Sequence, residues 1–222
     1  MAVVPLRDGV SGKSRLATAL DPRARRRLVA TLARHVVGVL AAAPLVDAVV
    51  VVTADVPFTR ETLAGLTPSG QGGIAPVTVV EQPADRPGLN AAVDVGRESA
   101  VALGAGRLLV AHADLPLLTT EDVAAVLAAG GLGRDAVVVA TDRHDGGTNL
   151  LLLPLDAGVG FGFRFGTGSR AAHVAEAERA GLRAAVLHRP GTAADLDTLD
   201  DWAQLPAGVR ERLHDGVGLP LT

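Results

Sequence analysis

The sequence predicts one α/β domain over residues 1–222, built on a mostly parallel mixed sheet with helices on both faces. Short runs of valine, leucine and alanine alternate with longer amphipathic stretches, which is the pattern of strands joined by crossover helices. The chain has no internal repeat and no long low-complexity linker that would separate two domains. A chain of this length buries roughly 70% of its unfolded surface, so one large core is available.

The apolar runs are too short for helices, and we expect them to be buried strands. They lie at Ala2–Leu6, Asp47–Thr53, Pro76–Glu81, Leu108–Ala111, Ala136–Ala140, Asn149–Pro154 and Leu182–Leu187. Helices are expected from Pro22, with Asp21 as the cap, and at Pro57–Leu66, Leu89–Leu103, Thr120–Ala129, Ser169–Gly181 and Asp195–Leu205. Leu89, Val93 and Val101 are expected to be buried positions of their helix, and Pro68–Gly73 is expected to be a loop.

Composition and charge narrow the class of protein. With 21 basic and 24 acidic residues and a formal net charge of −3, the chain has no electrostatic footprint for nucleic acid or a membrane surface. The absence of cysteine excludes disulfides and thiolate metal sites. No signal peptide is visible, and the longest apolar region, Val36–Val52, is interrupted by Pro44 and Asp47. We therefore expect a cytoplasmic protein.

The stretch Arg107–Leu118 predicts a ligand-binding site. Its apolar strand runs into the sequence HADLP, residues 112–116, whose proline disfavours helix and stops the strand ladder. Asp114 is therefore expected just past the carboxyl end of a central strand, where open α/β sheets bind ligands. A carboxylate beside a nucleotide phosphate is a natural Mg²⁺ ligand. The alternative, that Asp114 caps the next helix, is weaker because Thr119 or Thr120 is the better-placed cap.

The first strand runs into a polar loop, Arg7–Arg15. Its Gly12-Lys13-Ser14 ending invites comparison with a P-loop, but Walker A needs a glycine at the position that Arg7 occupies. What remains is a strand-to-helix turn with two glycines and three cations, which can hold a polyphosphate at the start of a helix. An ordinary charged surface turn is the alternative. Lys13 is the only lysine in the chain.

Two glycine-containing turns are candidates for binding an anionic substrate. In Asp145–Asn149, the Thr148 hydroxyl and the glycine amides can receive an anion, although Asp-Gly-Gly also suits a plain hairpin. Phe165–Ser169 opens a helix, where Ser169 is either part of an anion site or only the N-cap.

A second carboxylate cluster lies near the end of the chain. Asp195 and Asp197 can point together if the segment is extended, or they can serve as helix caps. None of the histidines has zinc spacing; His112 is expected to pack or bond locally, and His173 is a candidate substrate contact. No G-x-S-x-G motif occurs, so no Ser-His-Asp nucleophile set is expected.

Together these segments resemble one family, the guanylyltransferases of coenzyme F-420 biosynthesis that act on 2-phospho-L-lactate or phosphoenolpyruvate. The matching residues run in order over nearly the whole chain. They are Val4-Pro5-Leu6, Gly12-Lys13-Ser14-Arg15-Leu16, Gly88–Ala92, Ala113–Leu117, Asp145–Asn149, Phe165–Ser169 with His173, and Asp195–Thr198. The resemblance implies a glycosyltransferase-A-like nucleotidyltransferase fold. Residues 7–12, and Arg170 where an aromatic residue is more usual, depart from the family pattern.

The resemblance also implies a role for each matching residue. The implied catalytic residues are Lys13, Arg15 and Asp114. The implied nucleotide ligands are Leu6, Arg7, Lys13, Ser14, Arg15, Gly88 and Asn90. The implied pocket for a three-carbon phosphorylated acid consists of Thr148, Gly166 and Ser169, and Mg²⁺ is implied at Asp114 and Asp197. GTP and that acid are the implied partners, and a homodimer is compatible with the family.

The implied reaction suits the residues. The acceptor's phosphate oxygen attacks the α-phosphorus of GTP and pyrophosphate leaves. A phosphate monoester has a second pKa of about 6 and is largely ionised at pH 7, so no general base is needed. The protein must supply alignment and neutralisation of charge. The alanine- and arginine-rich, lysine-poor composition is typical of a high-GC bacterium, for which the resemblance implies phosphoenolpyruvate as the acceptor, while 2-phospho-L-lactate and phosphoglycerate stay open.

Two other interpretations stay open. One is another nucleotidyltransferase of the same fold, such as a molybdopterin guanylyltransferase or a sugar-phosphate nucleotidyltransferase, although the glycine-rich first loop typical of those enzymes is absent here. The other is a non-catalytic nucleotide-binding protein, against which the joint presence of Lys13, Asp114 and Asp197 argues.

Overall fold

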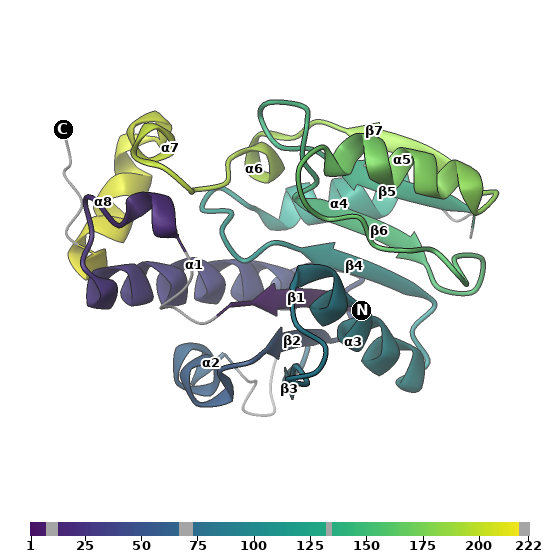
Figure 1. Ribbon diagram of the computed structural model, residues 1–222, viewed down its shortest axis with the longest axis horizontal. Coiled ribbons are helices and arrows are strands. Elements are labelled where there is room, and N and C mark those ends of the chain that lie inside the picture. Colours follow the sequence, from purple (N-terminus) through teal and green to yellow (C-terminus); the bar gives the residue numbers. More distant parts are fainter. Residues whose placement is uncertain (8–12, 67–72, 132–134, 218–222) are drawn as a thin grey trace.

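The computed structural model describes residues 1–7, 13–66, 73–131 and 135–217, and a seven-stranded sheet forms the centre of this part of the chain (Figure 1). The strands are β1 (Ala2–Leu6), β2 (Val49–Thr53), β3 (Val77–Glu81), β4 (Arg107–Ala111), β5 (Ala136–Ala140), β6 (Leu150–Pro154) and β7 (Arg183–Leu187). Their order in the sheet is β3-β2-β1-β4-β6-β5-β7. Strand β6 is antiparallel to both neighbours and the remaining pairs are parallel, which confirms the predicted mixed sheet.

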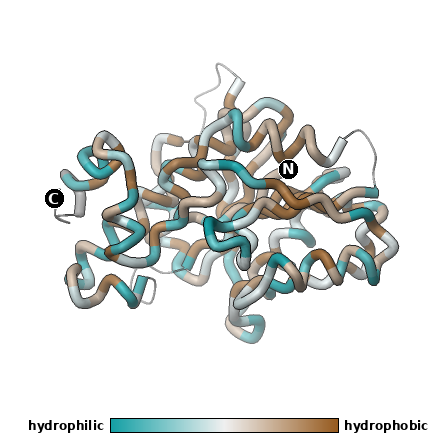
Figure 2. The backbone as a smooth tube through the Cα atoms, turned by 90° about the horizontal axis from the view of Figure 1, so that it is seen from above, coloured by the Kyte–Doolittle hydropathy of each residue, from teal (hydrophilic) through white to brown (hydrophobic). Residues whose placement is uncertain are grey.

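Helices cover both faces of the sheet, as predicted (Figure 1). One face packs against α1 (Pro22–Ala42), α2 (Val56–Leu63) and α4 (Thr120–Ala129). The other packs against α3 (Leu89–Ala102) and α5 (Ser169–Arg179). Successive valines of β2 alternate between the two cores, because side chains of a strand point to opposite faces. The hydropathy colouring places the most apolar backbone in these central strands (Figure 2).

Local sequence signals determine where several helices begin. Asp21 caps α1 by accepting a hydrogen bond from the Ala24 N–H at 2.7 Å. Thr119 and Asp122 form a capping box at the start of α4, so of the two caps that the sequence left open, Thr119 and Thr120, Thr119 is the one used. Glycine at position 96 lets α3 approach the sheet closely, since a Cβ there would overlap the side chain of Val3 in β1.

The C-terminal part of the chain forms a layer against the start of α1. It contains α7 (Leu199–Gln204) and α8 (Ala207–Val217), and the short 3-10 helix η1 (Ser14–Leu16) packs beside it. The short helix α6 (Pro190–Ala193) lies apart from this layer, next to Leu117 and Asp122. Leu28 and Leu32 of α1 belong to the same buried cluster as Trp202 and Leu213. Helices η1, α6 and α8 were not predicted, because their apolar positions are too few for a clear helical pattern.

Two expectations were wrong. Val101 is 59% exposed, because the buried face of α3 follows Ala92, Gly96 and Ala100, and Val101 lies about 100° of helical rotation beyond that face. The segment Asp195–Leu205 is not one helix: its first residues are irregular, and α7 begins only after Thr198, which caps it. The loop expected over Pro68–Gly73 falls outside the described residues except at its last position.

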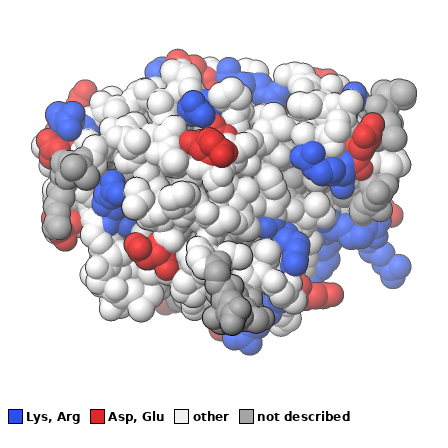
Figure 3. Space-filling model, turned by 180° about the vertical axis from the view of Figure 1, so that it is seen from behind, with Lys and Arg blue, Asp and Glu red and all other residues white. Residues whose placement is uncertain are grey.

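The surface agrees with the composition. Acidic and basic side chains are interspersed over the face seen in Figure 3. Among the described residues, no helix combines the length and the hydrophobicity that crossing a membrane requires.

Candidate active site

A buried cation and two carboxylates meet where strands β1 and β4 end. The Lys13 Nζ lies 2.5 Å from Asp114 Oδ2 and 2.7 Å from Asp197 Oδ1. The Lys13 side chain is 8% exposed, against 25% for Asp114 and 43% for Asp197, so the ammonium is the innermost of the three groups. The structure thus brings together residues that are 101 and 184 positions apart in the sequence.

The backbone conformation determines where these three side chains lie. Lys13 has a φ of +56°, a left-handed conformation that non-glycine residues rarely adopt, and η1 begins directly after it. The Asp114 carbonyl accepts a hydrogen bond from the Leu196 N–H at 3.1 Å, which ties the loop after β4 to the segment that carries Asp197. Asp114 therefore lies just past the carboxyl end of β4, as the sequence predicted.

Arg143 and Asp201 hold the segment that carries Asp197, and the sequence analysis assigned neither of them a role. Asp201 Oδ2 accepts hydrogen bonds from the N–H groups of Asp197 and Thr198 at 2.9 and 2.8 Å. Arg143 donates to the Asp195 carbonyl oxygen at 3.1 Å and lies 3.4 Å from Asp201 Oδ1. The capping-box spacing Thr198-x-x-Asp201 was the available signal for Asp201.

The charges of the cluster stabilise one another. Burial disfavours the Lys13 ammonium, but the two carboxylates outweigh burial and raise the pKa of Lys13 above its ordinary value. Burial likewise opposes ionisation of Asp114, but the charge of Lys13, its hydrogen bond and His112 lower the pKa of Asp114 below the usual range. Both groups are therefore ionised at neutral pH.

Asp195 lies beside this cluster and behaves differently. Burial and the charges of Asp114 and Asp197 raise the pKa of Asp195.

In the part of the chain that the structure describes, no three His, Asp or Glu side chains are grouped closely enough to form a metal centre alone. A metal ion at this edge would therefore depend on Asp114 and Asp197 together with oxygens from a ligand or water.

A cavity of about 330 Å³ opens at the same edge of the sheet, after β1, β2 and β3. Leu6, Arg7 and Gly88, three of the predicted nucleotide ligands, line it, and Gly88 begins α3 with a φ of +94°. Gln82 also lines the cavity and was not predicted from the sequence; its amide donates to the Arg86 and Gly88 carbonyl oxygens.

The remaining predicted nucleotide ligands are arranged differently. Arg15 is exposed, the Ser14 side chain is not described, and residues 8–12 of the predicted phosphate turn lie outside the described part. The Asn90 amide is engaged with the backbone of Phe165: its Oδ1 accepts from the N–H at 2.8 Å and its Nδ2 donates to the carbonyl at 3.1 Å. A nucleotide role for these residues stays a prediction.

The structure joins the two turns that were predicted to bind the acid. The N–H of Arg170 donates to the Gly146 carbonyl oxygen at 3.2 Å, which connects the start of α5 to the turn between β5 and β6. Thr148 and Ser169 are buried and Gly166 is exposed. Gly168, not Ser169, is the N-cap of α5. The backbone N–H groups of Thr148 and Gly166 donate to no other described residue, so both can receive an anion.

Comparisons with known proteins agree with this geometry. Residues 1–206 match the family model described as "Guanylyl transferase CofC like". The phosphoenolpyruvate guanylyltransferase of Rubrobacter xylanophilus is 40% identical over 214 residues, which cover 95% of this chain and 96% of the relative. The enzyme of the same name from Sphaerobacter thermophilus is 41% identical over 206 residues, covering 92% and 91%.

The chain belongs to the CofC-like guanylyltransferase family. It is therefore a guanylyltransferase, and the resemblance drawn from its motifs is confirmed. This membership decides against a nucleotidyltransferase of another family.

Solved structures support the fold. A Desulfovibrio desulfuricans protein described as a nucleotide-diphospho-sugar transferase matches with a TM-score of 0.70 at 18% identity, covering 97% of this chain and 95% of that one. The CMP:2-keto-3-deoxy-manno-octonic acid synthetase complexed with CTP matches with a TM-score of 0.60 at 13% identity, covering 97% and 98%. The predicted nucleotidyltransferase fold is confirmed.

Proposed function

We propose that the chain transfers the guanylyl group of GTP to phosphoenolpyruvate with release of pyrophosphate, and that Asp114 and Asp197 hold Mg²⁺. The cluster of Lys13, Asp114 and Asp197 at the carboxyl edge of the sheet carries the proposal. The relatives named phosphoenolpyruvate guanylyltransferase support the choice of acceptor. Because both substrates are cytoplasmic metabolites, we place the enzyme in the cytoplasm.

The carboxylates fit the proposed ion. Asp114 Oδ1 is buried and has no hydrogen-bond partner among the described residues, so one acceptor of the cluster is available for a cation. Mg²⁺ in proteins is typically held by one or two carboxylates, substrate phosphates and water, which matches this pair. When bound, the ion would offset the negative charge of the GTP phosphates.

The protein's own groups would bind and align the nucleotide. Leu6, Arg7 and Gly88 offer the 330 Å³ cavity to the nucleoside. Lys13 supplies a fixed positive charge beside the carboxylates, and with Arg15 it would stabilise the leaving pyrophosphate. Fixed charges in a partly buried site need no reorganisation during the reaction, which is the main way such a site lowers a barrier.

The acceptor site must bind the acid as an anion and leave the phosphate of that acid free to attack the α-phosphorus of GTP. The backbone N–H groups of Thr148 and Gly166, with Ser169 beside them, would hold the acid. The attacking phosphate oxygen is already ionised at neutral pH, so the reaction requires no base from the protein. Alignment of the two substrates is then the contribution asked of the site.

The test is pyrophosphate release by the purified protein with GTP and Mg²⁺. Phosphoenolpyruvate, 2-phospho-L-lactate and 3-phosphoglycerate are added separately, and the product is followed by mass. We expect release only with phosphoenolpyruvate, and loss of release on chelation of Mg²⁺ with EDTA. Release with another acid would change the acceptor, and undiminished release in EDTA would overturn the metal assignment.

A non-catalytic protein would give a different result. It would bind GTP in a calorimetric titration but release no pyrophosphate with any of the three acids. That outcome would overturn the proposed reaction while leaving the nucleotide cavity intact.

A further inference from the structure

His173 lies at the junction of three segments of the predicted acid pocket. The imidazole of this α5 residue has no exposed surface. Its Nδ1 lies 3.0 Å from Thr148 Oγ1 in the turn between β5 and β6, and its Nε2 accepts a hydrogen bond from the Arg164 N–H at 3.0 Å. Both ring nitrogens are therefore engaged, so His173 has no group to offer a substrate, contrary to the expectation from sequence.

These two contacts determine where the imidazole proton lies. A backbone N–H can only donate, so Nε2 must be an acceptor without a proton. A neutral imidazole carries its one proton on the other nitrogen, so Nδ1 is the donor and Thr148 Oγ1 accepts. The backbone of Arg164 thus sets the tautomer of His173.

The tautomer in turn sets the direction of the Thr148 hydroxyl. A hydroxyl that accepts from Nδ1–H must donate its own proton in another direction. Thr148 is 1% exposed, and no described residue accepts that proton. A buried donor without an acceptor is costly, and it indicates that a ligand completes the hydrogen bond.

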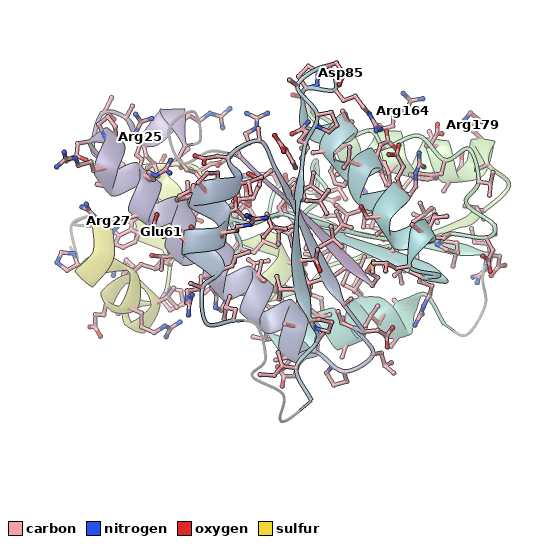
Figure 4. The ribbon with its side chains drawn as sticks, turned by 90° about the horizontal axis from the view of Figure 1, so that it is seen from below. Arg25, Arg27, Glu61, Asp85, Arg164 and Arg179 are labelled. Atoms are coloured by element: carbon pink, nitrogen blue, oxygen red, sulfur yellow. The ribbon has the colours of Figure 1, made fainter. Side chains whose placement is uncertain are left out.

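The surroundings keep the ring neutral and fixed. The ring stacks on Phe161 with centroids 6.1 Å apart and meets Phe165 edge to face at 4.7 Å. Burial, reinforced by the charge of His112, lowers the pKa of His173 to about 4. Glu176, on the same helix, accepts a hydrogen bond from the Gly162 N–H at 2.7 Å and pairs with Arg179. The Arg164 guanidinium lies 3.5 Å from Glu176 Oε2, and Figure 4 shows Arg164 and Arg179 at the same end of the molecule.

We propose that His173 is a positioning residue of the acceptor site: as a neutral Nδ1–H imidazole it orients the Thr148 hydroxyl to donate to the anionic acid. The inference rests on the proposed function, because the anion is the acceptor that the reaction requires. His173 itself does not touch the substrate. It acts through Thr148 and through the Arg164 backbone, which leads to the free N–H of Gly166.

The tautomer can be observed directly. In the ¹⁵N NMR spectrum of the labelled protein at pH 7, we expect a protonated Nδ1 and an unprotonated Nε2 for His173, assigned by loss of the signals in His173→Gln. A proton on Nε2, or on both nitrogens, would overturn the proposal. This measurement needs neither substrate nor activity, so it distinguishes failure of the inference from failure of the proposed function.

A matched pair of variants separates the two hydrogen bonds. The amide of asparagine reaches the position of Nδ1 and can donate to Thr148, whereas the amide of glutamine reaches the position of Nε2 and can accept from Arg164. We expect His173→Gln to raise the KM for phosphoenolpyruvate about tenfold or more, since hydrogen bonds to charged groups are the stronger class. His173→Asn should restore much of this loss, with the KM for GTP unchanged in both.

The double variant with Thr148→Val tests whether His173 acts through Thr148. Thr148→Val alone should raise the KM for phosphoenolpyruvate as much as His173→Gln, and Thr148→Ser should not. Adding His173→Gln to Thr148→Val should cause no further rise, because the two residues form one unit. Additive effects, or equal losses in the asparagine and glutamine variants with a matching fall in Tm, would show a merely structural role and overturn the inference.

Discussion

The sheet has one described cavity at its amino edge, where the parallel strands begin, and one at its carboxyl edge, where they end. The cavity at the carboxyl edge is the smaller of the two and belongs to the candidate site. The cavity at the amino edge has a volume of about 670 Å³, twice that at the carboxyl edge. Met1, Leu45, Asp47, Leu103 and Arg107 are among its lining residues. Among the described residues, volume alone would therefore favour the edge opposite the candidate site.

The orientation of the helices explains the difference. Leu103 and Gly131, which line the larger cavity, directly follow or lie close to the ends of α3 and α4, where helix dipoles present negative charge. At the carboxyl edge, α3 begins at the smaller cavity with the positive end of its dipole, and Lys13 adds a full charge. A triphosphate is favoured at the second edge and disfavoured at the first, whatever their volumes.

The largest expected difference between the edges comes from removing one carboxylate at each and comparing the two losses of activity. We expect Asp114→Asn to lower kcat/KM about 10³-fold, equivalent to about 4 kcal/mol of transition-state stabilisation, because it removes a proposed metal ligand. Asp47→Asn, which changes an exposed carboxylate lining the larger cavity, should stay within twofold. Steady-state pyrophosphate release measures both. Near-full activity in Asp114→Asn, with a large loss in Asp47→Asn, would move the site to the amino edge.

Removing one cation at each edge is expected to have the next largest effect. Lys13→Gln should lower kcat about 10²-fold, because it removes the charge proposed to stabilise the leaving group. Without that charge, burial would raise the pKa of Asp114, so the acid limb of the pH–rate profile should move to higher pH. At the amino edge, the Arg107 guanidinium donates to the Leu127 and Gly131 carbonyl oxygens, and Arg107→Gln should keep kcat within twofold. Equal losses in the two variants would contradict the comparison.

The sequence could predict what depends on local pattern. The strand before Asp114, the proline at 116 and the Thr119 cap are consecutive in the chain, and together they located Asp114 at the end of β4. The alternation of apolar runs and helices was likewise sufficient for the fold class. These features are determined by neighbours in the sequence, so no knowledge of the tertiary structure was needed.

Local sequence pattern could not predict which segments meet, and only the family resemblance implied that Lys13, Asp114 and Asp197 share one site. Lys13, Asp114 and Asp197 come together because β1 and β4 are neighbours and because Leu196 bonds to the Asp114 backbone. No local pattern contains that information. The same holds for Arg143, whose partners lie more than 50 positions away, and for His173, whose proton is placed by Arg164 and Thr148.

The two edges should also differ in their tolerance of added volume. A Cβ at Gly191, in α6 at the carboxyl edge, would collide with Asp122 and lie 2.6 Å from the Leu117 carbonyl oxygen. Because Asp122 is itself held by Arg189 at 2.9 Å, it cannot easily move, and we expect Gly191→Ala to lower the free energy of unfolding by about 2 kcal/mol. Gly106→Ala, in open space at the amino edge, should change it by less than about 0.5 kcal/mol. Urea denaturation measures both, and equal values would show that the carboxyl edge is not packed more tightly.

The smallest expected effect tests the nucleotide cavity itself. Ala84 is exposed and lines the smaller cavity, so a tryptophan there would occupy space proposed for the nucleoside without disturbing the buried core. We expect Ala84→Trp to raise the KM for GTP about tenfold, equivalent to about 1.4 kcal/mol, while the KM for phosphoenolpyruvate and kcat change little. Ala105→Trp places the same side chain in the larger cavity, at a partly buried position, and should leave all three constants unchanged. A higher KM for GTP in Ala105→Trp, but not in Ala84→Trp, would mean that the nucleotide binds at the amino edge and that volume outweighs the helix dipoles. The opposite result would show that strand direction and helix polarity select the site, even when a larger cavity lies at the other end of the same sheet.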